Sequence, residues 1–425
     1  MVRLEEHKEA TENKPIETLP LAAKAYIPLS QHIGKICSPL VKIGDSVEVG
    51  QKIADVQAHV YAPIHASISG KVVSIQDWPH PVLGQNKAIV IENDRLERAQ
   101  NARAGKTQSE IDNLTPEQIR NIVLEAGIVG MGGASFPAHI KLNPPKPVDT
   151  LIINGAECEP YLTGDYRLMV EKTKEILLGI NLVAKCLGIK KIYIAIEDNK
   201  PQAIKQFTIH NVQQFTIKVL KSAYPQGGEK QLIKNIIAKE VPQGKLPFDI
   251  GVVVHNVATV YAIYEAVYLG KPLYERVVTV TGSCLSHPKN LLVRIGTPIK
   301  ELIDFCAPVK EEPVKIIIGG PMMGIAQFSD ETPVIKSTTG ILLLSKKEVP
   351  LYEELPCIRC GACVRECPVY LMPTLINLSS QKGFWPQAKL YGALDCIECG
   401  ICNYVCPSKI RLVHSIKRVK LELIK

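Results

Sequence analysis

A repeated cysteine motif near the C-terminus constrains this chain more than any other feature. The pattern C-x2-C-x2-C-x3-C-P occurs twice, and each cysteine of the second copy follows its counterpart by 39 positions. The first copy consists of Cys357, Cys360, Cys363 and Cys367, and the second of Cys396, Cys399, Cys402 and Cys406. This spacing is typical of chains that bind two [4Fe–4S] clusters.

In such a pair of motifs, the fourth cysteine of each copy ligates the cluster of the other copy. We therefore assign Cys406 to the cluster of Cys357, Cys360 and Cys363, and Cys367 to the cluster of Cys396, Cys399 and Cys402. Zinc is the alternative, because four-cysteine zinc sites also use C-x2-C pairs. The three-plus-one spacing with a trailing proline, present twice, favours the clusters, whose chemistry is the passage of single electrons.

The remaining five of the thirteen cysteines are scattered, and free cysteine is usually a buried apolar residue. The chain carries 50 Lys and Arg against 42 Asp and Glu, and 46% of its residues are hydrophobic. Such a composition is typical of a globular protein of several domains and excludes wholesale disorder.

We expect no membrane-spanning helix, because the most apolar stretch, Gly251–Leu269, contains His255 and Glu265. We also expect no secretory signal at Met1–Lys14, and thus a reducing, intracellular compartment.

The chain is predicted to be a multidomain α/β protein. Short apolar runs between Gly, Pro and Asp indicate a small all-β module, and alternating strands and helices indicate a mostly parallel sheet. The predicted strands are Thr150–Ile153, Lys191–Ile196, Thr216–Leu220 and Ile250–Val254, and the helices are Asp165–Leu187, Pro201–His210, Glu229–Lys239 and Val257–Leu269. The expected segments are a flexible lead-in (1–20), the all-β module (21–95), a linker (96–114), the α/β domain (115–270), a mixed β module (271–335) and a helical, cysteine-rich domain (336–425).

Polar residues gather where the predicted strands give way to helices. A glycine-rich loop, Gly127–Lys141, follows a predicted helix rather than a strand, so it lacks the context of a Rossmann dinucleotide fingerprint. Such a loop alone is more often a simple turn. Three further junctions, Asn154–Tyr161, Tyr224–Lys230 and His255–Thr259, follow strands. Because open α/β sheets bind ligands beyond the carboxyl ends of their strands, the four segments together predict a binding site.

These four segments, in this order, resemble the flavin-binding subunit of respiratory complex I. From about residue 20 to residue 410 the chain resembles the RnfC family of the Rnf ion-translocating oxidoreductases, on Ile27–Gly34, Gly319–Gly324 and Cys357–Pro373. The resemblance implies a lipoyl-like barrel-sandwich module, a Rossmann-like flavin domain that binds FMN and NADH, a soluble-ligand-binding β-grasp module and a two-cluster ferredoxin-like domain. The stretch Gln57–Tyr61 lacks the lysine that carrier domains modify, so we expect the barrel-sandwich module to be structural.

The resemblance also implies which residues hold FMN, and it implies no acid–base catalyst. The implied residues are Gly130, Gly132, Lys141, Asn154, Glu157, Glu159, Tyr224, Gly227, Asn256 and Thr259. Three positions depart from the complex I pattern, since Met131 replaces Arg, Ala156 replaces Asp and Gly228 replaces Glu. Ser135 replaces a glycine expected among the Rnf proteins. The placement of FMN is therefore better supported than the specificity for nicotinamide.

By this resemblance, the chain is the electron-input subunit of a membrane-bound complex. It would take a hydride from NADH onto FMN and send single electrons through two [4Fe–4S] clusters, with the membrane subunits and the iron–sulfur B subunit as partners, at the cytoplasmic face of the bacterial inner membrane. The alternatives are a soluble reductase of the cobalamin reductase type and a non-catalytic electron-wire subunit. We expect no nucleic acid partner. The basic stretch Lys409–Lys425 either faces anionic lipid or an acidic partner, or packs on the cluster domain.

Overall fold

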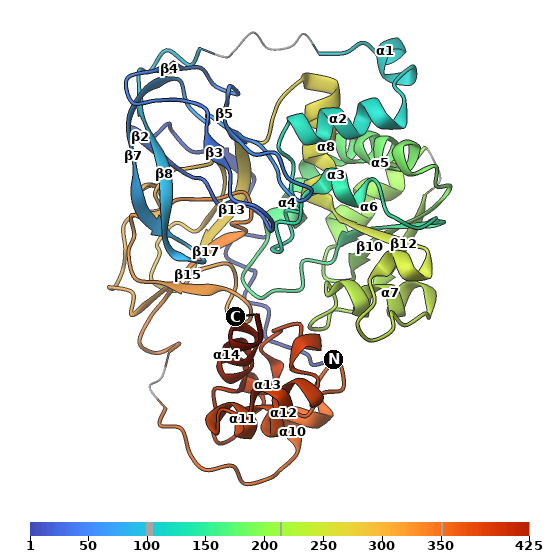
Figure 1. Ribbon diagram of the computed structural model, residues 1–425, viewed down its shortest axis with the longest axis vertical. Helices are drawn as coiled ribbons and strands as arrows, with labels where there is room; N and C mark the ends of the chain where they lie inside the picture. The colour runs from blue at the N-terminus through green and yellow to red at the C-terminus, as the bar shows by residue number, and fades with distance from the viewer. Residues whose placement is uncertain (99–104, 213–214, 350–351, 425) are drawn as a thin grey trace.

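The computed structural model describes residues 1–98, 105–212, 215–349 and 352–424. Figure 1 shows the barrel-sandwich strands and the helices around the α/β sheet side by side, with the cluster domain at the far end of the long axis. Residues 99–104 of the predicted linker lie outside the described residues. Beyond them, α1 (Gln108–Asp112) and α2 (Pro116–Glu125) begin at the capping threonines Thr107 and Thr115.

The N-terminal module consists of two small sheets packed face to face. One sheet has the order β2 (Lys24–Pro28), β8 (Gly84–Asn93), β7 (Gly70–His80) and β4 (Ser46–Val47). The other has the order β3 (Ser38–Pro39), β5 (Lys52–Asp55) and β6 (Ile64–His65). Alternate residues such as Ile27, Ile53 and Ile89 point inwards and form one core, as expected for strands with a period of two.

The α/β domain is built on a fully parallel sheet. Its strands have the order β11 (Thr216–Leu220), β10 (Lys191–Glu197), β9 (Thr150–Gly155) and β12 (Val252–Asn256). Side chains on one face of the sheet pack against α5 (Thr173–Leu187) and α8 (Val257–Leu269), and those on the other face pack against α7 (Glu229–Ile237). Helix α6 (Pro201–His210) has the predicted bounds. Both faces are thus covered, as parallel sheets require.

Several predicted bounds in this domain are wrong by a few residues, since α7 ends at Ile237 rather than Lys239 and β9 extends to Gly155 rather than Ile153. The predicted helix Asp165–Leu187 is divided at Lys172 into α4 (Gly164–Glu171) and α5. The hydroxyl of Thr173 donates to the carbonyl of Met169, so a local side-chain hydrogen bond accompanies the break. Strand β12 begins two residues later than predicted, because Pro247–Ile250 forms a 3-10 turn.

The mixed β module is a six-stranded sheet that draws strands from beyond its predicted limits. Its order is β1 (Ile16–Thr18), β14 (Lys289–Arg294), β13 (Glu275–Thr281), β17 (Gly340–Leu344), β15 (Lys315–Ile318) and β16 (Ile325–Gln327), and α9 (Ile299–Phe305) packs on it. Placing β17 in the C-terminal domain was wrong, because this fully buried strand pairs with β13 and β15. The boundary at 335 therefore cuts through one sheet.

The expectation of a flexible lead-in at residues 1–20 is also wrong. β1 pairs with β14, Val2 forms a bridge with Tyr224, and Lys8 and Thr11 are buried. Because these contacts are with distant parts of the chain and follow no period, the local sequence carried no sign of them.

The C-terminal domain repeats its structure as it repeats its cysteines. The short helices α10 (Ala362–Arg365) and α13 (Ile401–Tyr404) are 39 residues apart, and so are the starts of α11 (Pro373–Gln381) and α14 (Leu412–Ile424). Helix α12 (Trp385–Leu390) lies between the halves. The apolar stripe Leu412, Ile416 and Val419 is fully buried, and α14 packs on α11, which favours packing over lipid contact for that stripe. Across the described residues, we find no helix with the length and apolarity to cross a membrane.

Candidate flavin and cluster sites

The carboxyl ends of β9 and β12 bring two predicted site residues together. Asn154 and Asn256 are register partners on these adjacent strands. The Asn154 amide donates to the carbonyl of Gly227 (2.9 Å), and its oxygen accepts from the backbone N–H of Ala156 (3.1 Å). Two strand-to-helix junctions that are far apart in sequence are thereby joined at one edge of the sheet, where α/β proteins bind ligands.

The glycine-rich loop lies over the first turn of α8. The backbone N–H of Met131 donates to the hydroxyl of Thr259 (2.9 Å), and a Cβ added to Gly132 would lie 3.3 Å from the Asn256 Cβ. Gly132 and Gly133 are exposed, and a Cβ at Gly133 would meet nothing within 4 Å. A backbone that is open on one side and held on the other suits close approach by a phosphate or a flat ring, so the loop fits a flavin.

Glu157 and Asn256 form a polar network with Asp165. The Glu157 carboxylate accepts from the backbone N–H groups of Asp165 (2.7 Å) and Tyr166 (3.0 Å), and so caps the start of α4. The Asn256 amide donates to the Asp165 carboxylate (2.6 Å). Burial, and then the nearby Glu157 carboxylate, raises the pKa of Asp165 to about 7. Asp165 was inside a predicted helix, and sequence analysis missed it because no pattern distinguishes it from other first-turn acids.

Two basic side chains lie near the strand edge. One is paired with a carboxylate, and the other is uncharged. The Lys141 ammonium forms an ion pair with Glu229 (2.8 Å), at the start of α7. Burial lowers the pKa of His255 to about 3, so this side chain is neutral at physiological pH. The positive charge offered to a ligand at this edge is therefore modest.

Glu159 and Tyr224 reach away from the strand edge towards the other modules. The Glu159 carboxylate accepts from the backbone N–H groups of Met322 (2.6 Å) and Met323 (3.0 Å), beside β15 of the six-stranded sheet. The buried Tyr224 hydroxyl donates to the carbonyl of Cys399 (2.8 Å) in the second cysteine motif. Both side chains join modules, a role that their sequence positions did not indicate.

The cysteines form two groups across the repeat. Cys367, Cys396, Cys399 and Cys402 line one cavity. Burial, and then the neighbouring thiols of Cys396, Cys399 and Cys367, raises the pKa of Cys402 to about 12. Cys363 is close to Cys406 and Cys357, since both thiols contribute to its raised pKa after burial. These proximities agree with the crossed assignment, which stays a prediction.

Each assigned group has the four cysteines that a [4Fe–4S] cluster requires. Among residues 1–98, 105–212, 215–349 and 352–424, no three His, Cys, Asp or Glu side chains converge closely enough to hold one metal ion. Four thiols around a cavity, in contrast, can each reach a separate iron of a cubane. Backbone N–H groups donate to three of the thiols, namely Cys357 from Arg359 (3.4 Å), Cys396 from Glu398 (3.4 Å) and Cys367 from Leu371 (3.3 Å).

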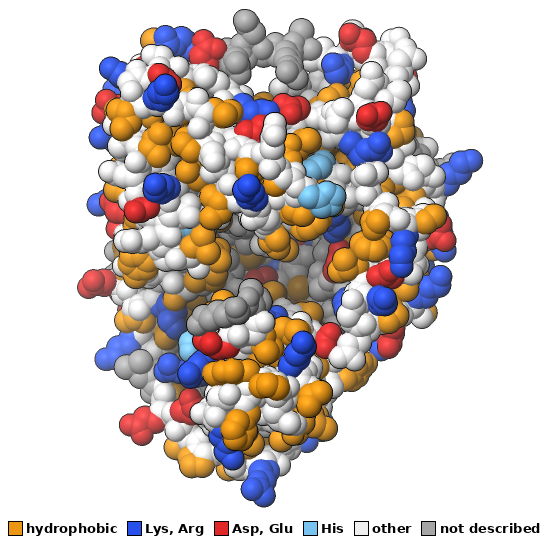
Figure 2. Space-filling model, in the orientation of Figure 1, with side chains coloured by type: hydrophobic (Ala, Val, Ile, Leu, Met, Phe, Trp, Pro, Cys, Tyr) orange, Lys and Arg blue, Asp and Glu red, His pale blue; other side chains and the backbone are white. Residues whose placement is uncertain are grey.

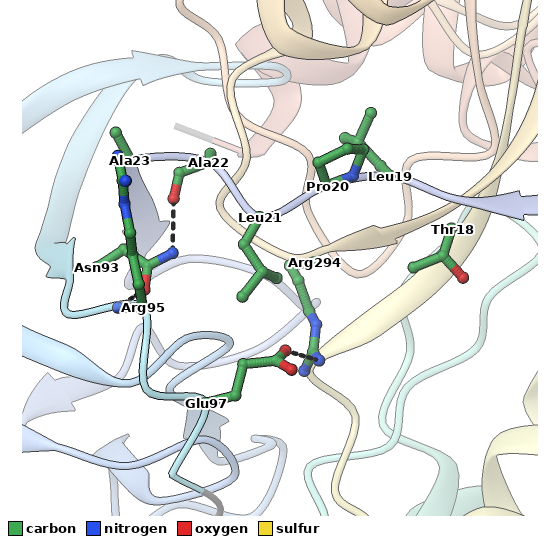
Figure 3. Close-up of a pocket in the computed structure, with 10 residues that line it drawn as sticks. All are labelled: Thr18, Leu19, Pro20, Leu21, Ala22, Ala23, Asn93, Arg95, Glu97 and Arg294. Atoms are coloured by element: carbon green, nitrogen blue, oxygen red, sulfur yellow. Dashed lines mark hydrogen bonds and ion pairs between the residues drawn. The ribbon is translucent and has the colours of Figure 1, made fainter.

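A cavity of about 520 Å³ lies elsewhere, between the β1–β2 connection and the end of β8 (Figure 3). The ion pair between Glu97 and Arg294 crosses it. None of the predicted flavin or cluster residues lines it. The space-filling view shows a separate hollow near the centre of one face, with acidic side chains inside it (Figure 2). The polar network at the strand edge, not the 520 Å³ cavity, is therefore the candidate site.

Four family models match successive parts of the chain. They are the RnfC barrel sandwich hybrid domain (residues 2–96), the Nuo51 FMN-binding domain (123–265), the SLBB domain (277–326) and a 4Fe-4S dicluster domain (356–410). The chain thus carries FMN and two [4Fe–4S] clusters, and the resemblance noted from the sequence is confirmed.

Curated relatives match over most of their length. The chain is 48% identical to the C subunit of a proton-translocating ferredoxin:NAD(+) oxidoreductase complex of Clostridium ljungdahlii, over 91% of this chain and 85% of the relative. It is 43% identical to the C subunit of a Na(+)-translocating complex of Acetobacterium woodii (98% and 95%), and 45% identical to the C subunit of an ion-translocating complex of Rhodobacter capsulatus (89% and 74%). The chain therefore belongs to the RnfC family, the C subunits of the Rnf ion-translocating oxidoreductase complexes.

Proposed function

We propose that this chain is the electron-input subunit of an Rnf-type complex, peripheral to the cytoplasmic face of the membrane. It takes a hydride from NADH onto FMN and passes single electrons towards the other subunits. Membership of the RnfC family, whose named members are parts of ferredoxin:NAD(+) oxidoreductase complexes, supports this function. The order of the FMN-binding and dicluster domains along the chain supports it as well.

FMN supplies the conversion between two-electron and one-electron transfer, and the clusters supply the one-electron path. In this proposal the chain holds FMN at the strand edge, with Asn154, Gly227, Asn256 and Thr259 fixing the loops around it. The exposed backbone of Gly132 would approach the cofactor, and Gly130 shapes the loop through the donation of its N–H to the Phe136 carbonyl (2.8 Å). Glu157 fixes the start of α4. Lys141 and its partner Glu229 flank the site.

One observation carries the proposed electron path, namely the 2.8 Å hydrogen bond from the Tyr224 hydroxyl to the Cys399 carbonyl. It joins a flavin loop directly to the second cysteine motif. The side chain of Gln231 on α7 adds a parallel contact, since it donates to the carbonyl of Pro368 (3.1 Å). We therefore propose that the cluster of Cys367, Cys396, Cys399 and Cys402 is the inner one, next to the flavin.

The other group is then the outer cluster. Cys357 and Cys360 are exposed, whereas Cys399 and Cys402 are buried. Because electron tunnelling requires close approach of the redox centres, an exposed cluster edge is where electrons can pass to another protein. The path that we propose runs from FMN to the inner cluster, then to the outer cluster and out of the subunit.

The test is anaerobic purification followed by two measurements. Flavin released on denaturation should be FMN at about one per chain, and NADH should bleach the flavin absorbance and then reduce the clusters. A chain that binds both clusters but no flavin would be an electron-wire subunit instead. NADH-dependent reduction of a free corrinoid substrate, without any partner subunit, would support the soluble reductase alternative.

A further inference from the structure

The N-terminal segment crosses the flavin domain and places a lysine beneath the predicted flavin loop. We propose that Lys8 is a positioning residue that holds the loop 154–162 in its flavin-binding conformation. This inference rests on the proposed binding of FMN at that loop. Lys8 is 4% exposed, and its ammonium donates to the carbonyls of Glu157 (2.6 Å) and Leu162 (2.7 Å).

The loop that Lys8 holds has a strained backbone. Glu157 has φ 47° and Tyr161 has φ 68°, and side-chain-bearing residues rarely adopt such left-handed conformations. These conformations persist only where the surrounding structure enforces them. The ammonium donates to the carbonyls of Glu157 and Leu162, one at each end of the turn, and so holds the two strained ends in place. The same turn directs the Glu157 carboxylate to the start of α4.

Anchors on both sides fix Lys8 in place. Before it, Val2 exchanges two backbone hydrogen bonds with Tyr224, and the backbone N–H of Tyr161 donates to the carbonyl of Glu6 (2.8 Å). After it, the hydroxyl of Thr163 donates to that of Thr11 (2.7 Å). The segment therefore approaches the flavin loop in one register, and Lys8 is not free to swing away.

The two hydrogen bonds hold a buried, polar side-chain nitrogen. A buried ammonium is costly unless it is hydrogen-bonded and faces negative charge. Burial, and then the neighbouring Lys200, lowers the pKa of Lys8, and the carboxylates of Glu157 and Glu197 offset part of this effect. An apolar side chain of the same length would leave the carbonyls of Glu157 and Leu162 without this donor.

The decisive variant is Lys8→Met, which retains the length and apolar stem of the side chain. We expect the dissociation constant of FMN, measured by reconstitution of the flavin-depleted protein, to rise by about tenfold or more. The iron content and the spectra of both clusters should not change, and excess FMN should restore NADH bleaching. The matched control is Lys14→Met, because Lys14 also donates to a distant carbonyl, that of Pro288 (2.8 Å), but in the β-grasp module.

Each outcome has a distinct meaning. If the unaltered chain binds no FMN, the proposed function fails. If it binds FMN and Lys8→Met binds it with the same affinity, only the role of Lys8 is overturned. If Lys8→Met does not accumulate, Lys8→Leu, which also removes the donor, takes its place, and unchanged flavin affinity in that variant would likewise overturn the inference. Equal losses in Lys8→Met and Lys14→Met would show a general effect of the N-terminal segment and would also contradict it.

Discussion

The two cysteine motifs have the same backbone but different surroundings. Left-handed residues recur 39 positions apart, with Arg359 (φ 54°) matching Glu398 (φ 57°) and Gly361 (φ 73°) matching Gly400 (φ 81°). At the matched glycines the second copy lies close to another module, because a Cβ on Gly400 would lie 2.7 Å from the Met322 carbonyl oxygen, whereas a Cβ on Gly361 would meet only the Arg365 side chain of its own copy (3.1 Å). The repeat therefore specifies two clusters, and the packing around each copy specifies which one faces the flavin.

Charge distinguishes the two copies as well. Glu398 of the second copy pairs with Lys420 (2.7 Å) and Lys417 (3.5 Å), and Lys420 also donates to the carbonyl of Cys396 (2.6 Å). The equivalent residue in the first copy is the cation Arg359, which lies in an exposed loop. The two motifs therefore have the same cysteine spacing but different electrostatic surroundings, and such surroundings tune the reduction potential of a cluster.

The largest effect should come from removing a crossed ligand. We expect Cys406→Ser to perturb or abolish the cluster held by Cys357, Cys360 and Cys363, with a loss of up to about half of the bound iron. Reduction of the flavin by NADH should persist, while onward transfer fails. Iron analysis and electron paramagnetic resonance would measure this, with Cys284→Ser, a buried cysteine outside the motifs, as control. Loss of the other cluster instead would mean that each motif closes its own site.

The packing difference predicts unequal effects of two matched glycine substitutions. Gly361→Ala and Gly400→Ala both place a side chain at positive φ, at a cost of about 1–2 kcal/mol. Gly400→Ala must also move the Met322 backbone, whereas Gly361→Ala meets only the flexible Arg365 side chain (3.1 Å). We expect Gly400→Ala to be more destabilising by roughly 1–3 kcal/mol in thermal unfolding, and to slow cluster reduction by NADH. Equal destabilisation would contradict the docking of the second copy.

Substitutions at the strand edge should separate the flavin from both clusters. We expect Asn154→Ala and Glu157→Ala to weaken FMN binding by about tenfold, through loss of loop hydrogen bonds, with both clusters retained. Glu157→Ala should also lower stability by about 1 kcal/mol, because it removes the cap of α4. Flavin content per iron measures the first effect. Full flavin retention with normal bleaching in both variants would place FMN elsewhere.

The smallest effect should come from the lysine beside the inner cluster. A positive charge favours the more negative, reduced cluster, so Lys420→Met should lower the potential of that cluster by roughly 20–60 mV. The outer cluster should shift less. Redox titration followed by electron paramagnetic resonance would resolve the two, and Lys382→Met, at an exposed position in the other half, serves as control. A larger shift in the reduction potential of the outer cluster would contradict the proposed assignment of the inner and outer clusters.

Local sequence patterns were sufficient to predict many of the secondary-structure elements and the cluster cysteines. The spacing of the eight motif cysteines, the helix Pro201–His210 and the start of α2 at Thr115 all depend on contacts within a few residues, which short sequence windows contain. The strand-to-helix junctions were also visible, because parallel strands necessarily bring their carboxyl ends to one edge. The domain limits remain proposals, and those at residues 20 and 335 need revision, since β1 and β17 share one sheet with β13.

Two sets of cluster thiols and a ligand-binding strand edge can be read from the amino-acid sequence alone, and the assignment of FMN to that edge is implied by the family resemblance. The connection between these centres exists only in the folded chain. Lys8 meets Glu157 across 149 positions, and Tyr224 meets Cys399 across 175. Such contacts are single hydrogen bonds between segments with no shared period, and they form only after the modules have packed. Local sequence preferences do not predict these contacts, because a buried polar group needs its hydrogen-bond partner only once the packed modules exclude water from it.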